Sequence, residues 1–333
     1  MWRLQALAQN TNLQRIAVLT SGGDAPGMNA AVRAVTRTAL AAGVEVIGIQ
    51  HGYIGLFERE ALSLDMASVG NIIQRGGTLL KTGRCEDFRH PAGRAQAAEY
   101  LRELGVDALV VIGGDGSLTG AHLLAQEQGI KVIGLPGTID NDIWGTEDTI
   151  GFDTAVNTAL EAIDRIRDTA DALDRLFLVE VMGRNTGFIA VQVALAGGAE
   201  GVISPEQPLD YADLVARLAA SRQRGKRSSI LVVAEGPKEG NSYQLAERLA
   251  GSGYPSRVCV LGHIQRGGRP TGHDRVLASM LGEQAVRYLL AGHDRIMLGV
   301  RDNQVVVVPL QELATKRKTL DVRYLEMVKT LAG

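Results

Sequence analysis

Three segments of this 333-residue chain combine glycine and aspartate in a way that could hold a phosphorylated ligand. They are residues 21–27 (SGGDAPG), 113–117 (GGDGS) and 136–142 (PGTIDND). Glycine lets backbone N–H groups approach phosphate oxygens closely, and the N-terminus of a following helix adds positive potential. Two glycine loops of this kind, 21–27 and 113–117, could bind more phosphate groups than a single loop, which suits a polyphosphate donor. The segments therefore predict a site for a ligand with several phosphates.

An aspartate lies inside the second of these segments. The carboxylate of Asp115 would repel a phosphate unless a cation lay between them, so we interpret it as a Mg²⁺ ligand, direct or through water. The alternative is a tight turn in which Asp115 caps a helix. A dinucleotide-binding loop fits less well, because Gly114, Gly116 and Gly120 give GxGxxxG instead of GxGxxG, and the chain has no P-loop.

The third segment carries two aspartates two residues apart. If the segment is extended, Asp140 and Asp142 point to the same side, because side chains alternate along a strand. Two nearby carboxylates suit a proton acceptor for a hydroxyl nucleophile with a metal-linked or orienting partner. The same letters could form an Asx-rich turn, since Asp and Asn bond to their own backbone. The sequence does not separate these two interpretations.

Basic residues accompany the glycine loops. Arginine at the end of a strand suits bidentate phosphate binding. Arg257, His263 and Arg266 bracket one expected strand, which is harder to explain as ordinary solvated surface. The complete set is Arg75, Lys81, Arg84, Arg89, Arg184, Arg257, His263 and Arg266.

The elements that must position these residues follow a regular pattern. Short apolar runs that end near glycine alternate with longer helical patterns, beginning with a helix over 28–42. We expect strands over 15–20, 45–49, 108–112, 131–135, 176–181, 230–234, 258–261 and 305–308, with those at 230–234 and 258–261 buried. This alternation predicts parallel sheets covered by helices on both faces, with ligands at the carboxyl ends of the strands. The polar stretch 157–174 is the expected crossing between two domains.

Composition narrows the class of protein. With 45% hydrophobic and 22% charged residues the chain is globular, and its net charge of −2 gives no overall field for nucleic acid or an acidic membrane. Aromatic residues make up 4%, which leaves little surface for base stacking. Two cysteines and no long apolar run favour a cytoplasmic protein. We expect residues 1–14 to form a disordered or surface extension.

Five motifs, in order, give the chain a resemblance to a known family. They are SGGDAPGMNA, IGGDGS, PGTIDND, VEVMGR and LGHIQRGG, and together they resemble the bacterial type of ATP-dependent 6-phosphofructokinase. The similarity runs from about Arg15 through the last motif and more loosely to the C-terminus. It implies two similar three-layer α/β domains with largely parallel sheets facing a cleft. The nucleotide domain would take 1–151 plus 265–315, and the sugar-phosphate domain 152–264 plus 316–333.

The resemblance also implies an activity and roles for individual residues. The family phosphorylates the 1-hydroxyl of fructose 6-phosphate with Mg-ATP, a step of glycolysis. Asp140 would be the base, with Thr138, Asp142, Arg84 and Arg184 completing the catalytic set. The ATP site would take Gly23, Arg84, Cys85, Arg89, Gly114, Asp115, Gly116 and Ser117, with Asp115 holding Mg²⁺. The sugar-phosphate site would take Thr138, Asp140, Arg175, Met182, Gly183, Arg184, Glu235, Arg257, His263 and Arg266.

The donor can be argued from two glycines. Relatives that use pyrophosphate carry Asp where this chain has Gly116 and Lys where it has Gly137. A carboxylate at 116 would crowd and repel the α-phosphate, so ATP is favoured. The alternatives are a pyrophosphate-dependent or other sugar-phosphate kinase of the same fold, or a nucleotide-sensing or NAD-binding protein without catalysis. The latter would have no need for both Asp140 and Asp142.

Assembly and regulation rest on the same resemblance. Arg175 and Arg257 match positions that reach a neighbouring subunit, which implies a homo-oligomer, with a tetramer expected. Family members bind ADP and phosphoenolpyruvate at a basic interface, for which the matching positions are Arg33, Arg37, Arg167, Glu200, Arg224, Lys226 and Arg227. Arg33 and Arg37 are four residues apart and so share a helix face. Glu60 departs from the pattern, because it stands where the family often has an effector-binding arginine, with Arg59 one step away.

Overall fold

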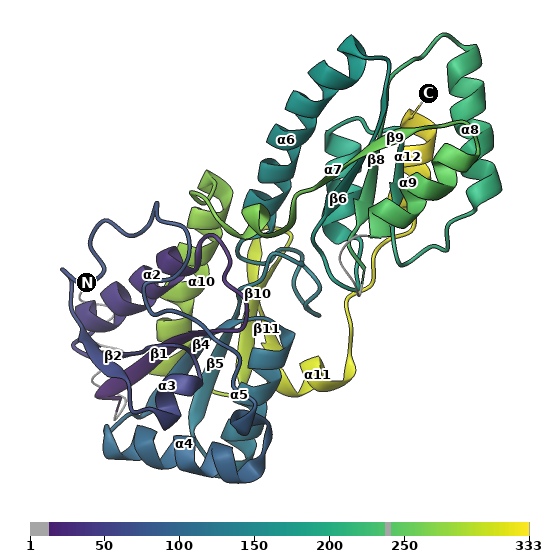
Figure 1. The fold of residues 1–333 in the computed structure, drawn as a ribbon. Coiled ribbons are helices and arrows are strands. Elements are labelled where there is room, and N and C mark those ends of the chain that lie inside the picture. The colour runs from purple at the N-terminus through teal and green to yellow at the C-terminus, as the bar shows by residue number, and fades with distance from the viewer. Residues whose placement is uncertain (1–12, 237–240, 333) are drawn as a thin grey trace. The chain divides into compact units, whose positions relative to one another are not determined.

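The computed structural model describes residues 13–236 and 241–332 (Figure 1). The expectation of a disordered extension over 1–14 falls largely outside these residues. Its last two positions are attached to the fold. Leu13 is buried, and the N–H of Gln14 donates to Asp107 Oδ2 at 2.7 Å.

The chain divides into two compact units. Unit 1 comprises Met1–Ile139, Ile143–Asp153 and Arg266–Lys318, and unit 2 comprises Asp140–Asp142, Thr154–Gln265 and Thr319–Gly333. Two differences from the expected boundaries have local causes. Asp140–Asp142 groups with unit 2, where Arg184 Nε lies 3.8 Å from Asp140 Oδ2. The segment 316–318 groups with unit 1, where Lys318 Nζ donates to Glu147 O at 2.7 Å.

Unit 1 is built on a seven-stranded sheet in the order β11-β10-β5-β4-β1-β2-β3. Its five inner strands are parallel, and β3 and β11 are antiparallel edges. The strands are β1 (Arg15–Ser21), β2 (Glu45–Ile49), β3 (Ala61–Leu64), β4 (Ala108–Gly113), β5 (Lys131–Pro136), β10 (Ile296–Arg301) and β11 (Gln304–Pro309). Continuous apolar runs such as ALVVI in β4 are fully buried, as expected for a parallel strand covered on both faces.

Helices cover both faces of this sheet. Figure 1 shows α2 (Met28–Ala41) and α10 (Gly272–Leu290) on one face, packed against each other, with α3 (Ile54–Phe57), α4 (Pro91–Glu103) and α5 (Asp115–Gln128) on the other. The short α11 (Leu310–Thr315) packs on α5, and a 3-10 helix, η1 (Asp87–Arg89), precedes α4. Helix α5 ends at Gly129, whose φ of +71° is the left-handed conformation that favours glycine.

Unit 2 contains a smaller, wholly parallel sheet in the order β7-β8-β6-β9. Its strands are β6 (Leu176–Val181), β7 (Gly201–Ile203), β8 (Ser229–Ala234) and β9 (Ser256–Val260). The helices are α6 (Phe152–Ala172), α7 (Phe188–Ala196), α8 (Tyr211–Gln223), α9 (Asn241–Gly251) and α12 (Arg323–Leu331), with a 3-10 helix, η2 (Gly262–Arg266). Leucines of α8 and α9 form a core with β6 and β8, and α12 packs on α7.

One expected strand differs from its prediction. We expected 258–261 to be a buried strand preceded by Arg257. Instead β9 is the edge of its sheet, Val260 is 36% exposed, and Arg257 lies within the strand as an exposed residue. An apolar run does not reveal whether a strand has one neighbour or two, and that decides its burial. Within the described residues, none of the helices is long and apolar enough to cross a membrane.

Candidate active site

The three glycine–aspartate segments leave the same edge of the unit 1 sheet. In the parallel register Ser21 pairs with Gly113, and Gly113 pairs with Pro136. The adjacent strands β1, β4 and β5 therefore end at one level, and each continues directly into one of the predicted loops. This arrangement brings together at a sheet edge residues that lie up to about 115 positions apart, which is the placement that ligand sites of parallel sheets use.

The first loop is tied to a second segment of the chain. The N–H of Gly22 donates to Gly83 O at 3.3 Å, and Thr82 Oγ1 donates to Gly22 O at 2.9 Å. One strand residue earlier, Thr20 Oγ1 donates to Lys81 O at 2.6 Å. These bonds hold the start of the 84–89 segment beside the loop, and so bring Arg84 close to Gly22.

Arg84, Cys85 and Arg89 themselves are solvent-accessible to different degrees. Arg84 and Arg89 are exposed, and Arg89 Nε lies 3.1 Å from Glu86 Oε2. Cys85 is half-buried, and this burial raises the pKa of its thiol. Two exposed cations therefore lie on the segment beside the loop, while Cys85 stays largely a neutral thiol.

The second loop closes against the first. Ser117 Oγ donates to Ser21 Oγ at 2.9 Å, and the buried Tyr53 hydroxyl donates to Ser117 O at 2.7 Å. Helix α5 begins at Asp115, so the backbone N–H groups of its first turn face the same sheet edge. A Cβ added at Gly116 would meet no heavy atom within 4 Å. One turn further on, a Cβ at Gly120 would meet the aromatic rings of Phe88 and Tyr53. The glycine at 116 therefore leaves open space beside the loop.

Asp115 is the residue predicted to hold Mg²⁺. Its side chain is 36% exposed, and Arg317 Nη2 lies 3.8 Å from its Oδ2. Among the described residues, no group of three or more His, Cys, Asp or Glu side chains could hold a metal ion by itself.

The third loop is not extended, and the alternation argument for Asp140 and Asp142 is wrong. Asn141 adopts a left-handed φ of +53°, so the chain turns between the two aspartates. Asp140 is 4% exposed and Asp142 is half-buried, which means that their environments differ. Asparagine tolerates this conformation better than most residues, so the Asx-rich turn was the better alternative.

Glycine is required at the start of this loop. A Cβ at Gly137 would lie 2.9 Å from Ile112 Cγ2 and 3.1 Å from Met28 Cε, and the N–H of Gly137 donates to Gly113 O at 3.0 Å. The backbones of β4 and β5 continue side by side here with no room for a side chain. A lysine at 137 would need the surrounding core to move.

In unit 2 the end of β6 forms a strained turn. Gly183 and Arg184 have φ values of +142° and +53°, and the N–H of Thr186 donates to Gly183 O at 3.0 Å. Glu235, which follows β8, accepts from the N–H of Arg184 at 2.9 Å. A left-handed arginine is uncommon, and such conformations persist where the surroundings fix them, frequently at binding sites.

This turn brings three of the predicted sugar-phosphate residues together with the predicted base. Arg184 Nε lies 3.8 Å from Asp140 Oδ2, and Arg184 is about half exposed. The N–H of Met182 donates to Gln265 Oε1 at 2.8 Å, which ties β6 to the segment that carries His263. His263 and Arg257 are exposed, and Arg175 is half-buried at the start of β6.

Arg266 lies against the first glycine loop. Its Nη1 donates to Asp24 O at 3.1 Å, and a Cβ at Gly23 would lie 2.6 Å from the same nitrogen. The expectation assigned Arg266 to the sugar phosphate and Gly23 to the nucleotide. In unit 1 the two are neighbours, and Arg266 contacts the loop that was predicted to bind the nucleotide.

The predicted effector residues fall into two groups. Arg33 and Arg37 share a face of α2; burial, and then the charge of Arg37, lower the pKa of Arg33. In unit 2, Glu200 Oε1 lies 2.7 Å from Lys226 Nζ and 3.8 Å from Arg167 Nη1. Arg224 and Arg227 follow α8 in the same charged turn.

The departure at Glu60 has a structural counterpart. Glu60 Oε2 lies 2.5 Å from His51 Nδ1. Its neighbour Arg59 pairs with Glu103 and lies over the Tyr100 ring, with Cζ 4.5 Å from the ring centroid. Arg59 is thus engaged by α4 and does not replace an arginine at position 60.

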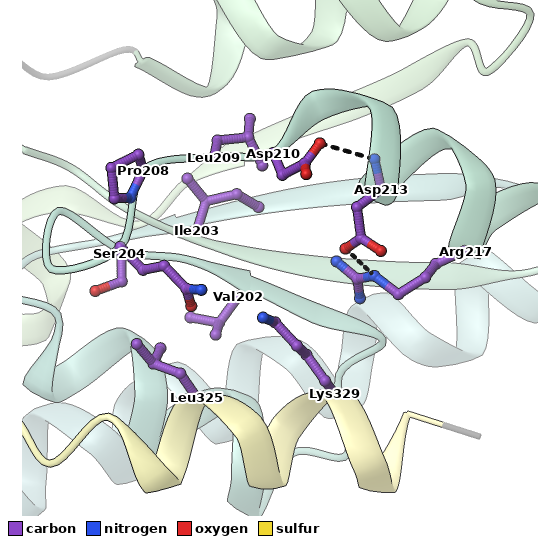
Figure 2. Close-up of a pocket in the computed structure, with 11 residues that line it drawn as sticks. Val202, Ile203, Ser204, Pro208, Leu209, Asp210, Asp213, Arg217, Leu325 and Lys329 are labelled. Carbon is purple, nitrogen blue, oxygen red and sulfur yellow. Dashed lines mark hydrogen bonds and ion pairs between the residues drawn. The ribbon is translucent and has the colours of Figure 1, made fainter.

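Unit 2 also contains a small pocket of about 50 Å³, which Figure 2 shows. It is lined by Val202, Ile203, Ser204, Gln207, Pro208, Leu209, Asp210, Asp213, Arg217, Leu325 and Lys329. The cations that line it are already paired: Arg217 Nε lies 2.9 Å from Asp213 Oδ2, and Lys329 Nζ lies 3.2 Å from Glu326 Oε1. None of the predicted site residues lines this pocket, and we assign no ligand to it.

Sequence reasoning missed the residues that support these loops. Thr149 Oγ1 donates to Thr138 O at 2.7 Å, and Glu206 Oε1 accepts from the N–H of Gly187 at 2.7 Å. Buried Asp274 accepts from the N–H of Gly151 at 2.8 Å. The sequence around Thr149, which stands between Asp148 and Ile150, gives no signal that its hydroxyl would be buried.

Fold and loops together define a two-unit α/β protein with glycine–aspartate loops at the carboxyl ends of parallel strands. A family model described as phosphofructokinase matches residues 15–289. The chain belongs to the phosphofructokinase family.

Known proteins of high similarity extend over nearly the whole chain. An ATP-dependent 6-phosphofructokinase 1 of Thermus thermophilus is 53% identical over 321 residues, covering 96% of this chain and 100% of that protein. An ATP-dependent 6-phosphofructokinase of Thermotoga neapolitana is 49% identical over the same coverage. Among solved structures, Pichia pastoris phosphofructokinase in the T-state matches with a TM-score of 0.87 and 38% identity. That match covers 91% of this chain but only 36% of the longer yeast chain.

Proposed function

We propose that this protein transfers the γ-phosphoryl group of ATP to the 1-hydroxyl of fructose 6-phosphate, giving fructose 1,6-bisphosphate. The proposal rests on one observation: the adjacent parallel strands β1, β4 and β5 end at the same edge of the sheet, and each continues into a glycine–aspartate loop. The bacterial relatives named above, which are called ATP-dependent 6-phosphofructokinases and match over their whole length, support the same reaction.

The nucleotide is assigned to unit 1. Backbone N–H groups of the loops at Gly23 and Gly114 bind phosphate oxygens, and Arg84 and Arg89 supply charge from the adjacent segment. Ser117 closes one loop on the other, while Gly116 leaves space for the nucleoside. Cys85 lies along the same segment. Because the transition state of phosphoryl transfer carries charge on its equatorial oxygens, positioning and charge compensation are the main contributions of these groups.

Asp115 would hold Mg²⁺ with the help of substrate phosphates and water. Bound there, the ion would supply positive charge that offsets the charge of the phosphates. Arg317, 3.8 Å from the Asp115 carboxylate, gives this acidic group a partner in unit 1.

Asp140 is assigned the role of proton acceptor for the 1-hydroxyl. It is nearly buried, and the guanidinium of Arg184 lies 3.8 Å away. Asp142 and Thr138 flank it in the chain, as orienting partner and contact of the transferred group. Arg184, placed by Glu235, would then offset charge on the moving phosphoryl group.

The sugar phosphate is assigned mainly to unit 2. Met182, Gly183, Arg184 and Glu235 lie at the ends of β6 and β8 and would contact the sugar hydroxyls. His263 and Arg266 would bind the 6-phosphate, and Arg175 and Arg257 would serve the site of a neighbouring subunit in a homotetramer. We also propose a cytoplasmic location, since Cys85 and Cys259 are both free thiols.

One coupled assay tests the proposed reaction. Purified protein receives Mg²⁺ and fructose 6-phosphate with either ATP or pyrophosphate, and bisphosphate production is followed through aldolase and NADH oxidation. We expect turnover with ATP at least about a hundredfold faster than with pyrophosphate, a difference of about 2.7 kcal/mol in transition-state binding. Glucose 6-phosphate in place of fructose 6-phosphate controls for acceptor choice. Turnover only with pyrophosphate, or only with another acceptor, would replace the proposal.

We further propose regulation by ADP and phosphoenolpyruvate at the basic effector positions. In unit 2 the support is the pair of cations Lys226 and Arg167, which lie beside the buried carboxylate of Glu200 and could turn to an anionic ligand instead. In unit 1 the support is the pair of like-charged residues Arg33 and Arg37, because a bound anion would relieve the repulsion between them. Hyperbolic fructose 6-phosphate curves that neither ligand shifts would remove this part of the proposal.

A further inference from the structure

A three-residue segment, 149–151, runs beside the start of the third loop. Thr149 Oγ1 donates to Thr138 O at 2.7 Å, and the N–H of Ile150 donates to Pro136 O at 2.8 Å. The N–H of Gly151 donates to Asp274 Oδ1 at 2.8 Å. We name residues 149–151 the strap. Thr149 and Ile150 are thus hydrogen-bonded to the predicted catalytic loop, and Gly151 is hydrogen-bonded to Asp274.

The strap is enclosed within unit 1. Thr149 is 1% exposed and Ile150 is 0% exposed. Gly151 has a φ of +106°, and a Cβ there would lie 2.7 Å from the Ala25 Cβ of the first glycine loop. A Cβ at Gly27 would likewise lie 2.7 Å from Ile150 Cγ2. The strap therefore fills the space between the first loop and the third, with no room for either to shift independently.

The anchor of the strap is a buried carboxylate. Asp274 is 0% exposed and lies in the first turn of α10, where its N–H donates to the N-cap Thr271 Oγ1 at 3.2 Å. Helix α10 packs along α2, which follows the first glycine loop. Asp274 thereby ties Gly151 to α10, and the packing of α10 against α2 limits the movement of the strap.

We propose that Thr149 is a positioning residue for phosphoryl transfer: through the carbonyl of Thr138 its hydroxyl holds the loop that leads into Asp140. The proposal rests on the reaction assigned above. The loop needs an external constraint, because Gly137 begins it and Asn141 turns it with a left-handed φ of +53°. A displacement of about 1 Å in a reacting group can cost about a hundredfold in rate.

The test compares two substitutions at Thr149 with one at a matched neighbour. Thr149→Val removes the hydroxyl at nearly constant shape, and Thr149→Ser keeps it. The matched control is Thr146→Val. Thr146 is also buried, at 4% exposed, but its hydroxyl donates to Asp148 O at 2.7 Å and accepts from the N–H of Val300 at 3.0 Å, away from the third loop.

We expect Thr149→Val to lower kcat and kcat/KM together by about tenfold or more, since a transition-state arrangement is lost while ground-state binding remains. The KM values for ATP and fructose 6-phosphate should stay within about twofold of the parent's. Thr149→Ser should restore kcat to within about threefold, and Thr146→Val should leave kcat within about twofold while lowering thermal stability. If Thr149→Val does not fold, Thr149→Ala replaces it with the same expectation.

Two kinetic outcomes overturn the proposal. One is a Thr149→Val enzyme with a kcat within about twofold of the parent's; the other is an equal loss in Thr146→Val, which would make the effect one of general stability. Hydrogen exchange separates failure of the strap from failure of the assigned reaction. The amides of Gly137, Ile150 and Gly151 should exchange faster in Thr149→Val than in Thr146→Val, whatever substrate the protein uses. Unchanged exchange at these amides also overturns the proposal.

Discussion

At the scale of single residues, two glycines at neighbouring loops do different things. A Cβ at Gly137 would collide with the side chains of Ile112 and Met28, whereas a Cβ at Gly116 would meet nothing within 4 Å. Glycine at 137 is therefore required by the packing of this fold. Glycine at 116 is not, so the reason for it has to lie in what occupies the open space.

Gly116→Asp tests that reason. The new carboxylate would fit the structure and, in the first turn of α5, would favour the helix dipole, so the protein should fold with unchanged or slightly raised stability. It would repel the α-phosphate of ATP, and we expect kcat/KM for ATP to fall by about a hundredfold or more, about 2.7 kcal/mol. Steady-state kinetics and thermal unfolding measure both effects.

The matched control for this substitution is Gly272→Asp. Gly272 also lies in the first turn of a helix, α10, and a Cβ there would also meet nothing within 4 Å. This variant should keep its ATP kinetics. If Gly116→Asp behaves in the same way, the argument for the donor from Gly116 is wrong.

Alkylation of the two cysteines tests the assigned position of ATP, because Cys85 lies in the predicted nucleotide segment and Cys259 lies in β9. Burial raises the pKa of both Cys85 and Cys259, so little thiolate forms near neutral pH and alkylation by iodoacetamide should speed up as the pH rises through the alkaline range. Mg-ATP should slow labelling of Cys85 about tenfold or more, since ligand occupancy blocks access, and leave that of Cys259 unchanged. Peptide mass spectrometry distinguishes the two sites. Equal protection of both, or of neither, would contradict the assigned position of ATP.

At the same scale, the sequence was informative about residue types and uninformative about conformation. The types and order of Asp140, Asn141 and Asp142 pointed to the reacting loop, but the expectation that both aspartates face one side failed because Asn141 is left-handed. The supporting residues Thr149 and Asp274 were not predicted. Asp274 meets Gly151 123 positions away, and no local pattern records such a contact.

At the scale of elements, a buried arginine joins three of them on the nucleotide side. Arg94 of α4 is 3% exposed, and its Nη1 donates to Phe88 O and Arg89 O in η1 at 2.9 and 2.8 Å. Its Nε and Nη2 each donate to Glu127 of α5 at 2.7 Å. This network fixes the backbone of η1, which carries Arg89, to the two helices beneath it.

The network predicts how stability depends on pH. The hydrogen bonds from Arg94 hold the pKa of Glu127 below its usual value. The stabilisation is therefore complete above the pKa of the unfolded chain, about 4.3, and is lost as pH falls through the lower folded value. Glu127→Gln should cost about 2 kcal/mol at pH 7 and should reduce the loss of stability on acidification.

Urea unfolding at pH 7 and at pH 3 measures this effect. Glu161→Gln is the control, because Glu161 pairs with Arg165 on the exposed face of α6, where such pairs contribute about 0.5 kcal/mol or less. A Glu127→Gln protein as stable as the Glu161→Gln protein at pH 7 would mean that the Arg94 network contributes nothing.

The positions of most elements followed from apolar periodicity, whereas their burial did not. Strands β2 and β6 have the bounds expected from the letters, and β1, β4 and β5 extend one residue further. For β9 the apolar run was correct and the expected burial was wrong, because the strand is the edge of its sheet. Strand order depends on which helices pack where, and that information is spread over the whole chain.

At the scale of the whole molecule, the chain has two units, each with its own parallel sheet, and the polypeptide passes between them more than once. Asp140–Asp142 belongs to unit 2 although it directly follows β5 of unit 1. The sequence could predict two α/β domains from alternation and length. It could not predict this short excursion, because no local pattern records that Asp140 lies beside Arg184, far along the chain.

The assembly is predicted at this scale. We propose that Arg175 and Arg257 act across a subunit interface of a homotetramer. We expect sedimentation equilibrium to give four times the chain mass of 35.5 kDa at micromolar concentration. A fully active monomer would contradict the roles given to Arg175 and Arg257.

The measurement that tests the central claim most directly is the kinetics of Asp140→Asn. Asparagine keeps the shape of the side chain and cannot accept the proton, so kcat should fall by about a thousandfold or more, about 4 kcal/mol, with KM for ATP and fructose 6-phosphate within about threefold. Asp148→Asn is the control: Asp148 is half-buried, with its Oδ2 3.1 Å from His273 Nε2, and this variant should keep its kcat. If Asp140→Asn forms fructose 1,6-bisphosphate as fast as the parent protein, Asp140 is not the base and the mechanism proposed for this chain is wrong.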